Sequence, residues 1–161
     1  MSWQLGRWYL LALFIIVIDQ LTKFWVTQMF AYGETFELLP ILNMTLVHNT
    51  GAAFSFLSDA GGWQRWFFVI ISMVVSTILA VWLYRLPSRQ YLLAMAITLI
   101  LGGALGNLCD RILLGYVVDF VDAHYQQHHW PAFNVADAAI TLGAVLLILE
   151  SLLAPKQRKM D

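Results

Sequence analysis

Charged residues and cysteines are scarce in this 161-residue sequence. Only 12% of its residues are charged and 60% are hydrophobic, whereas a soluble domain carries about 25% charged residues. The chain is therefore expected to have the lipid bilayer as its solvent. Its one cysteine, Cys109, excludes an intrachain disulfide, a CxxC redox pair and a cysteine-based zinc cluster. A net charge of −1 offers no basic surface for nucleic acid, so we expect no nucleic-acid partner.

Four long apolar stretches predict four membrane-spanning helices, at about residues 8–30, 66–84, 91–109 and 135–154. The middle two have no charged residue over 19 positions, close to the roughly 20 residues that cross a hydrocarbon core. The first contains Asp19 and Lys23, which must face protein rather than lipid, and the fourth contains Asp137 and Glu150. We expect a mainly α membrane protein in which residues 1–161 form one domain, because the links are too short for a second one.

The distribution of Lys and Arg predicts how the bundle is oriented. One side carries Arg7, Arg85, Arg89, Lys156, Arg158 and Lys159. The other side carries only Arg65 and Arg111, so both termini are expected in the cytoplasm. The segments Ala31–Arg65 and Asp110–Asn134 then lie on the outer face. Two charges interrupt the first span where a secretory cleavage site would follow, so we expect this segment to be retained.

The first outer segment mixes β-branched and aromatic residues with polar ones. This pattern, around Ile41–Leu46 and Ala52–Leu57, predicts a short sheet at the membrane surface, with Gly51 permitting a turn. We interpret the tryptophans at positions 63, 66 and 130 as anchors in the outer aromatic belt.

Small residues crowd the outer end of the third span. Gly102 and Gly106 have the GxxxG spacing that lets another helix approach closely. Dimerisation would also use this motif, but a bundle this small needs close contacts of its own, so we favour packing within the chain.

Ionisable groups at membrane depth are expensive and are therefore functional candidates. Asp19 lies four residues before Lys23, so the two share a helix face and are expected to form a structural charge pair. Asp110 adjoins Arg111 and is expected to be its charge partner. Asp122 lies in a more polar stretch and is expected to be solvated.

Two carboxylates at the outer end remain, Asp119 and Asp137. Asp119 lies between apolar neighbours, and a satisfied interface carboxylate is an equally good interpretation of it. Asp137 follows Asn134 by three residues, so the two could simply form a capping box at the start of the fourth helix. If the fold brings both carboxyls close together in a poorly hydrated site, however, the pair would hold one proton and could activate water.

Five motifs extend this argument. They are Asp19-Gln20-Leu21-Thr22-Lys23, Asn49-Thr50-Gly51-Ala52-Ala53-Phe54-Ser55, the run from Gly102 to Arg111, Val117-Val118-Asp119-Phe120 and Phe133-Asn134-Val135-Ala136-Asp137-Ala138. In order and approximate spacing, they resemble the motifs of bacterial lipoprotein signal peptidase (signal peptidase II), and the resemblance spans nearly the whole chain.

The resemblance implies a four-helix bundle in the bacterial inner membrane, with a small sheet and a short lid helix over a periplasmic active site. It implies that Asp119 and Asp137 are the catalytic pair of an aspartyl endopeptidase. Residues that position substrate or stabilise the site would be Asn49, Asn107, Arg111 and Asn134, while Asp19 and Lys23 would be structural. The implied substrates are diacylglyceryl-modified prolipoproteins, cut just before the lipidated cysteine. The resemblance implies no metal and no cofactor, and we expect a monomer in contact with membrane lipids.

Four alternatives are open to test. A proton-coupled transporter would also place acids in a bundle, but here they gather at one interface. A thiol peptidase would pair Cys109 with His48 or His124. A metal site would use His124, His128 and His129, although no HExxH glutamate accompanies them. A purely structural membrane subunit would tolerate loss of both candidate aspartates.

Overall fold

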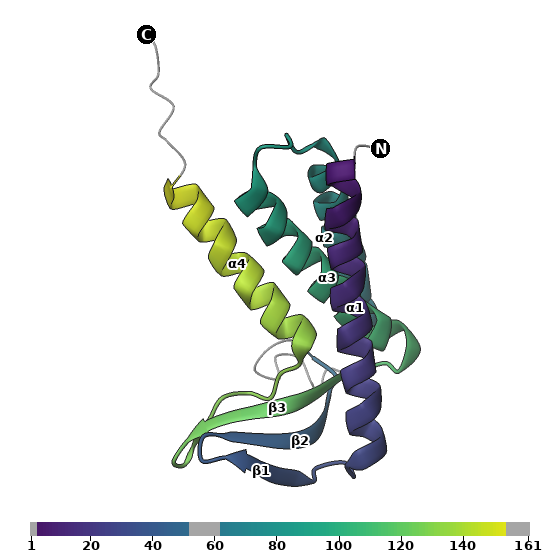
Figure 1. The fold of residues 1–161 in the computed structure, drawn as a ribbon. Coiled ribbons are helices and arrows are strands. Elements are labelled where there is room, and N and C mark those ends of the chain that lie inside the picture. Colours follow the sequence, from purple (N-terminus) through teal and green to yellow (C-terminus); the bar gives the residue numbers. More distant parts are fainter. Residues whose placement is uncertain (1–2, 52–61, 154–161) are drawn as a thin grey trace.

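The computed structural model describes residues 3–51 and 62–153, which form four long helices and a small antiparallel sheet (Figure 1). The helices are α1 (Trp3–Met29), α2 (Trp63–Arg85), α3 (Tyr91–Leu113) and α4 (Val135–Leu153). Each is long and apolar enough to cross a membrane. The predicted membrane bundle with a small sheet is therefore confirmed.

The third helix differs from its predicted extent. We ended this span at Cys109, but α3 continues to Leu113, so Asp110 and Arg111 lie in its last turns and not in an outer loop. Their polar groups are satisfied by protein partners at that depth. Arg65 of α2 supports this end of α3, because its guanidinium donates to the carbonyls of Arg111 and Ile112 at 2.8 Å each.

α3 is the central helix of the bundle. In its most apolar window, 61% of the residues are buried inside the protein, against 28% or less for the other three helices. Gly102 and Gly106 face α1, where an added Cβ would lie 2.9 Å from Ile15 Cβ and 2.7 Å from Asp19 Oδ2, respectively. Gly103 faces α4, where an added Cβ would clash with the carbonyl oxygen of Ala136. The expected packing role of the GxxxG motif within the chain is therefore confirmed.

The sheet has the strand order β1 (Thr35–Leu39), β2 (Leu42–Asn49), β3 (Val117–Tyr125) and β4 (His128–His129), and all of its pairings are antiparallel. It lies at the end of the bundle opposite the start of α1 and the end of α4 (Figure 1). The stretch Ile41–Leu46 was expected to contribute to it and does. The stretch Ala52–Leu57 lies outside the described residues. Within the described ranges, no short helix accompanies the four long ones.

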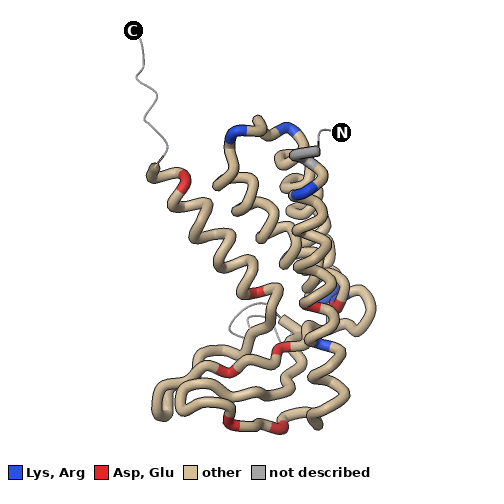
Figure 2. The backbone as a smooth tube through the Cα atoms, in the orientation of Figure 1, with Lys and Arg blue, Asp and Glu red and all other residues tan. Residues whose placement is uncertain are grey.

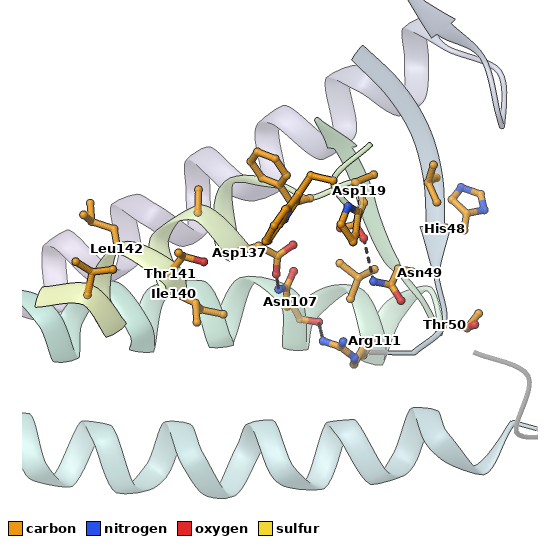
Figure 3. Close-up of a pocket in the computed structure, with 18 residues that line it drawn as sticks. His48, Asn49, Thr50, Asn107, Arg111, Asp119, Asp137, Ile140, Thr141 and Leu142 are labelled. Carbon is orange, nitrogen blue, oxygen red and sulfur yellow. Dashed lines mark hydrogen bonds between the residues drawn. The ribbon is translucent and has the colours of Figure 1, made fainter. Parts of the chain in front are cut away.

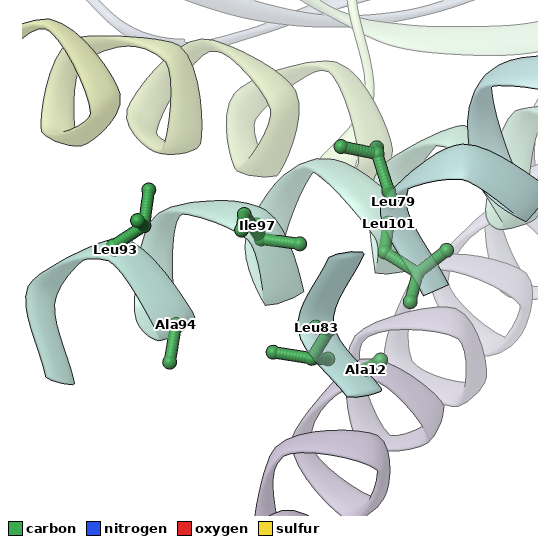
Figure 4. Close-up of a cluster of buried hydrophobic side chains, with 7 residues drawn as sticks. All are labelled: Ala12, Leu79, Leu83, Leu93, Ala94, Ile97 and Leu101. Carbon is green, nitrogen blue, oxygen red and sulfur yellow. The ribbon is translucent and has the colours of Figure 1, made fainter. Parts of the chain in front are cut away.

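The two ends of the bundle have different interiors. Near the α2–α3 link, a cluster of buried apolar side chains joins three helices (Figure 4). Its members are Ala12, Leu79, Leu83, Leu93, Ala94, Ile97 and Leu101. Most acidic residues lie toward the sheet, while basic residues occur both there and around the α2–α3 link (Figure 2). The buried charged residues Asp19, Lys23, Asp110 and Asp119 all lie toward the sheet end.

Candidate active site at the junction of sheet and helices

A pocket of about 830 Å³ opens where the sheet meets the helices (Figure 3). Its walls come from the end of β2, the start of β3, the segment after β4, the last turns of α3 and the first turns of α4. Six residues were predicted to act at the site, and five of them line this pocket: Asn49, Asn107, Arg111, Asp119 and Asp137. The sixth is Asn134. The fold thus brings together residues that are up to 88 positions apart in the sequence.

Asp119 enters the pocket from β3, where it pairs with Val47 of β2. Its carboxyl is 2% exposed and accepts two amide hydrogen bonds, from Asn134 to Oδ1 at 2.7 Å and from Asn49 to Oδ2 at 3.0 Å. Burial, followed by the charge of Asp137, raises the pKa of Asp119 to about 7, although the two amide bonds lower it. This carboxyl can therefore hold or release a proton near neutral pH.

Asp137 lies in the first turn of α4. Its Oδ1 accepts a 2.7 Å hydrogen bond from Asn107, and its Oδ2 accepts the backbone N–H of Asn134 at 3.3 Å. In return, Asn134 Oδ1 accepts the backbone N–H of Asp137 at 2.9 Å. The two residues form the predicted reciprocal cap, and the same carboxyl faces the pocket. Asp137 therefore caps α4 and lines the pocket at the same time.

Asn134 connects the two candidate acids. Its amide nitrogen donates to Asp119, while its backbone and amide oxygen bond Asp137. The side chain is 1% exposed, so it cannot exchange these partners for water. One buried residue therefore bonds both carboxyls, Asp119 through its side chain and Asp137 through its backbone N–H.

Arg111 supplies positive charge to the same pocket. The prediction that it pairs with Asp110 is wrong: its guanidinium donates to the carbonyl oxygens of Gly51 at 3.0 Å and Asn107 at 3.4 Å. It also lies over the ring of Phe68, 5.3 Å from the centroid. Gly51 itself donates its N–H to Asn49 Oδ1 in a bend after β2, so Arg111 holds this end of the strand against α3.

The partner of Asp110 is Lys23. The expected pair of Lys23 with Asp19 is present at 2.8 Å, and a second bridge joins Lys23 to Asp110 Oδ2 at 2.9 Å. Gln20 donates to Asp110 Oδ1 at 2.8 Å. Two acids and one base are therefore buried together between α1 and α3, next to the pocket.

Asp122 also differs from its prediction. It is not simply solvated, because it accepts hydrogen bonds from Asn43 and His129, each at 2.9 Å. Burial alone would raise its pKa, but these two partners outweigh it and the pKa of Asp122 is lowered. Asp122 does not line the pocket. It belongs to the distal part of the sheet.

The thiol-peptidase and metal-site alternatives depend on residues that lie mostly outside the pocket. The described residues that line the pocket include His48 but not Cys109 or His124. His124 and His129 stack with ring centroids 5.0 Å apart, and residues 3–51 and 62–153 contain no group of three His, Cys, Asp or Glu side chains able to hold a metal ion.

Sequence reasoning missed two walls of the pocket. One is the segment Trp130–Phe133, of which only Trp130 was considered, as a membrane anchor. The other is a stripe on α4 formed by Ala138, Thr141, Leu142 and Val145. The stripe has the spacing i, i+3, i+4, i+7 counted from Ala138, so helical periodicity from the residue after Asp137 could have found it. The pocket thus has a polar end at the carboxyls and a mainly apolar side that continues along α4.

Three comparisons with known proteins agree. Residues 11–153 match the family described as Signal peptidase (SPase) II. A lipoprotein signal peptidase of Acinetobacter baumannii is 55% identical over 151 residues, which cover 94% of this chain and 86% of that protein. One from Shewanella halifaxensis is 52% identical over 153 residues, covering 95% and 90%. A solved bacterial membrane enzyme, determined by the in meso method at 2.3 Å resolution, is similar with a TM-score of 0.85 and 34% identity, covering 97% of this chain and 93% of that one.

Proposed function

Because the chain belongs to the signal peptidase II family of membrane peptidases, we propose that it removes signal peptides from diacylglyceryl-modified prolipoproteins as an aspartyl endopeptidase. The bond cut is the one just before the lipidated cysteine. The observation that carries the proposal is the pair Asp119 and Asp137, which line one pocket and are linked by Asn134, with the pKa of Asp119 raised to about 7.

The chemistry follows from one proton shared by the pair. The ionised carboxylate removes a proton from water as the water oxygen bonds to the scissile carbonyl carbon. The protonated carboxyl gives its proton to the carbonyl oxygen, producing a neutral tetrahedral diol. A proton then passes from one carboxyl to the leaving nitrogen, the C–N bond breaks, and the other carboxylate takes a proton from a diol hydroxyl. The products are a new carboxyl and a new amine, and the pair again holds one proton.

The amides around the pair give this chemistry its geometry. Asn49 and Asn134 hold the two oxygens of Asp119, and Asn107 holds Asp137. Their hydrogen bonds stabilise the ionised carboxylate and so oppose the effect of burial. The bonds therefore keep a second proton from staying on the pair. Arg111 lies on the pocket wall, where its charge can stabilise the negative charge that develops on a carbonyl oxygen during attack.

The apolar wall suits a lipid-anchored substrate. Leu142 and Val145 are 52% and 46% exposed on the lipid-facing side of α4, in line with the pocket. Acyl chains that remain in the bilayer beside α4 would place the modified cysteine next to the carboxyls. Each methylene buried in this way contributes about 0.8 kcal/mol to the anchoring. We place the pocket on the periplasmic side of the inner membrane, with both termini in the cytoplasm, on the distribution of basic residues.

The test is the conversion of each candidate acid to its amide. Asp119→Asn and Asp137→Asn keep the shape of the side chain and remove its acid, so each should lower cleavage of a lipidated precursor at least about 1,000-fold. Cleavage is measured as mature lipoprotein released from a purified precursor in detergent or vesicles, with insertion and thermal stability checked in parallel.

Asp122→Asn is the matched control. It changes the same residue type on the same strand, outside the pocket, and should keep cleavage within about threefold of the wild-type rate. Turnover close to the wild-type rate in either Asp119→Asn or Asp137→Asn would refute the shared-proton mechanism. Equal losses in all three variants would point to general damage to the fold.

A further inference from the structure

The ammonium group of Lys23 has three acceptors in the protein interior. They are Asp19 Oδ2 at 2.8 Å, Asp110 Oδ2 at 2.9 Å and Asn107 Oδ1 at 2.9 Å. The side chain is 4% exposed, so these three oxygens use all of the N–H groups that an ammonium carries. Ion pairing with the two acids accounts for the first two bonds. It does not account for the third.

The third bond determines which way the Asn107 amide faces. An ammonium can only donate, so the group 2.9 Å from it must be the amide oxygen of Asn107. The amide nitrogen then faces the opposite way, where it donates to Asp137 Oδ1 at 2.7 Å. Rotating the amide by half a turn would set NH₂ against ammonium and oxygen against carboxylate, and both contacts would become repulsive. The Asn134 side-chain amide also donates to Asn107 Oδ1, at 3.2 Å, but the bond from Lys23 is shorter and comes from a charged donor. Lys23 is thus the stronger of two donors that select one orientation of Asn107.

The acids bound to Lys23 hold the backbone beside each candidate catalytic residue. Asp19 Oδ1 accepts the N–H of Ala136 at 2.9 Å, one residue before Asp137. Asp110 Oδ2 accepts the N–H of Val118 at 3.1 Å, one residue before Asp119. The cluster between α1 and α3 is therefore bonded to both acid-bearing elements, β3 and α4.

We propose that Lys23 is a positioning residue for the reaction, acting through Asn107, whose amide it orients toward Asp137. The proposal rests on the proposed function of Asp119 and Asp137. It goes beyond a structural charge pair, because a structural pair needs only Asp19 and would have no effect on catalysis once the fold is formed.

A double-mutant cycle tests this. The four proteins are the wild type, Lys23→Met, Asn107→Ala and the double variant, each assayed for kcat and KM on a purified diacylglyceryl-modified precursor. Lys23→Met should lower kcat about 10- to 100-fold, the size of effect expected when a catalytic group is misplaced, and change KM by less than about threefold. In the Asn107→Ala background, Lys23→Met should lower kcat no further than about threefold, because the residue through which it acts is already gone.

Lys23→Met leaves two buried carboxylates without their cation, and this could prevent folding. A second variant, Lys23→Met combined with Asp110→Asn, removes one charge of each sign and keeps the net charge of the cluster. It should show the same loss of kcat and the same absence of further effect in the Asn107→Ala background. Leu93→Ala, in the apolar cluster at the other end of α3, provides a destabilised control whose kcat should be unchanged.

The outcomes separate this proposal from the one before it. If Lys23→Met and Asn107→Ala multiply each other's effects on kcat, or if both Lys23 variants keep the wild-type kcat while Asp119→Asn is inactive, the positioning role is wrong and the aspartyl mechanism stands. If Asp119→Asn and Asp137→Asn are themselves active, the proposed function fails, whatever Lys23 does.

Discussion

The two ends of the helix bundle are held together in different ways. At the α2–α3 link, the cluster around Leu83 and Ile97 is purely apolar, and its members need only volume and shape to fit (Figure 4). At the sheet end, buried carboxylates, amides and one ammonium make hydrogen bonds with specified partners. The first kind of packing tolerates substitutions that conserve volume. The second kind does not, because each group left without its partner is a buried unsatisfied charge or dipole.

This contrast indicates why so costly a polar cluster lies beside the pocket. A buried ion pair is a poor source of stability, since removing two charges from water costs about as much as their attraction returns. What such a cluster provides is a fixed orientation of the groups bonded to it. Asp19, Lys23 and Asp110 each make a bond to a group adjacent to a candidate acid. The apolar end therefore supports the fold and the polar end determines the geometry of the site, a division that substitutions can test.

The largest effect apart from the two aspartates is expected at Asn134. Asn134→Ala removes the amide bond to Asp119 Oδ1 and the cap on the backbone N–H of Asp137, so the Asp119 carboxyl loses a fixed partner and the helix turn that carries Asp137 loses its cap. We expect kcat/KM to fall on the order of 1,000-fold, while loss of the cap costs only about 1 kcal/mol of stability. Asn43→Ala is the matched control, because Asn43 bonds the carboxyl of Asp122, outside the pocket. Comparable losses in the two variants would contradict a special role for Asn134.

The next effect is a dependence on pH. Burial and the neighbouring Asp137 raise the pKa of Asp119 to about 7, so the pair keeps its shared proton below that pH and loses it above. Since the singly protonated pair is the active form, kcat/KM should fall about tenfold per unit above pH 7, or roughly 100-fold by pH 9. Asp122→Asn should follow the same curve. A flat profile between pH 7 and 9, measured with the protein folded throughout, would contradict the shared proton.

The sequence predicted those features that depend on local pattern. Uncharged runs of helical length located α2 and α3, and the three-residue spacing of Asn134 and Asp137 predicted the cap at the start of α4. The GxxxG spacing predicted a close helix approach within the chain, and the helix that makes it is α1. Each is a relation between residues close in sequence, so knowledge of tertiary structure was not needed.

Partners that come from distant segments were mispredicted. Asp110 was assigned to its neighbour Arg111, but adjacent helical residues point in different directions, and its side-chain partners Lys23 and Gln20 come from α1. Asp122 was expected to be solvated because its own segment is polar, yet β2 supplies Asn43 across the sheet. Five of the six side chains predicted for the site do line one pocket, but the bonds that orient them depend on tertiary packing.

A smaller effect on cleavage is expected from a residue that has no side chain. Gly103→Ala would push a methyl group into the carbonyl of Ala136 and against Ile140, displacing the first turn of α4 that carries Asp137. We expect kcat/KM to fall about tenfold, as for a catalytic group shifted by less than 1 Å. The control is Gly143→Ala, whose added methyl would meet Ala96 O at 2.8 Å in the middle of the same helix. It should destabilise the protein similarly, as measured by thermal unfolding, but reduce cleavage less. The opposite order would mean that the first turn of α4 does not position the acid.

The smallest effect on cleavage is expected at the apolar end, where the effect on stability is nevertheless real. Leu83 is 1% exposed, and Leu83→Ala leaves a cavity that its neighbours in α1 and α3 fill only in part. In a soluble core such a change costs about 2–5 kcal/mol. Here the leucine of a separated helix would still lie in lipid, so only packing is lost and we expect about 2 kcal/mol or less. Reversible unfolding in mixed detergent micelles measures the difference, and Leu83→Met, which conserves volume, is the control. Because this cluster makes no bond to the pocket, kcat/KM below the unfolding temperature should match the wild type. A loss of cleavage without loss of fold would show that the two ends are coupled.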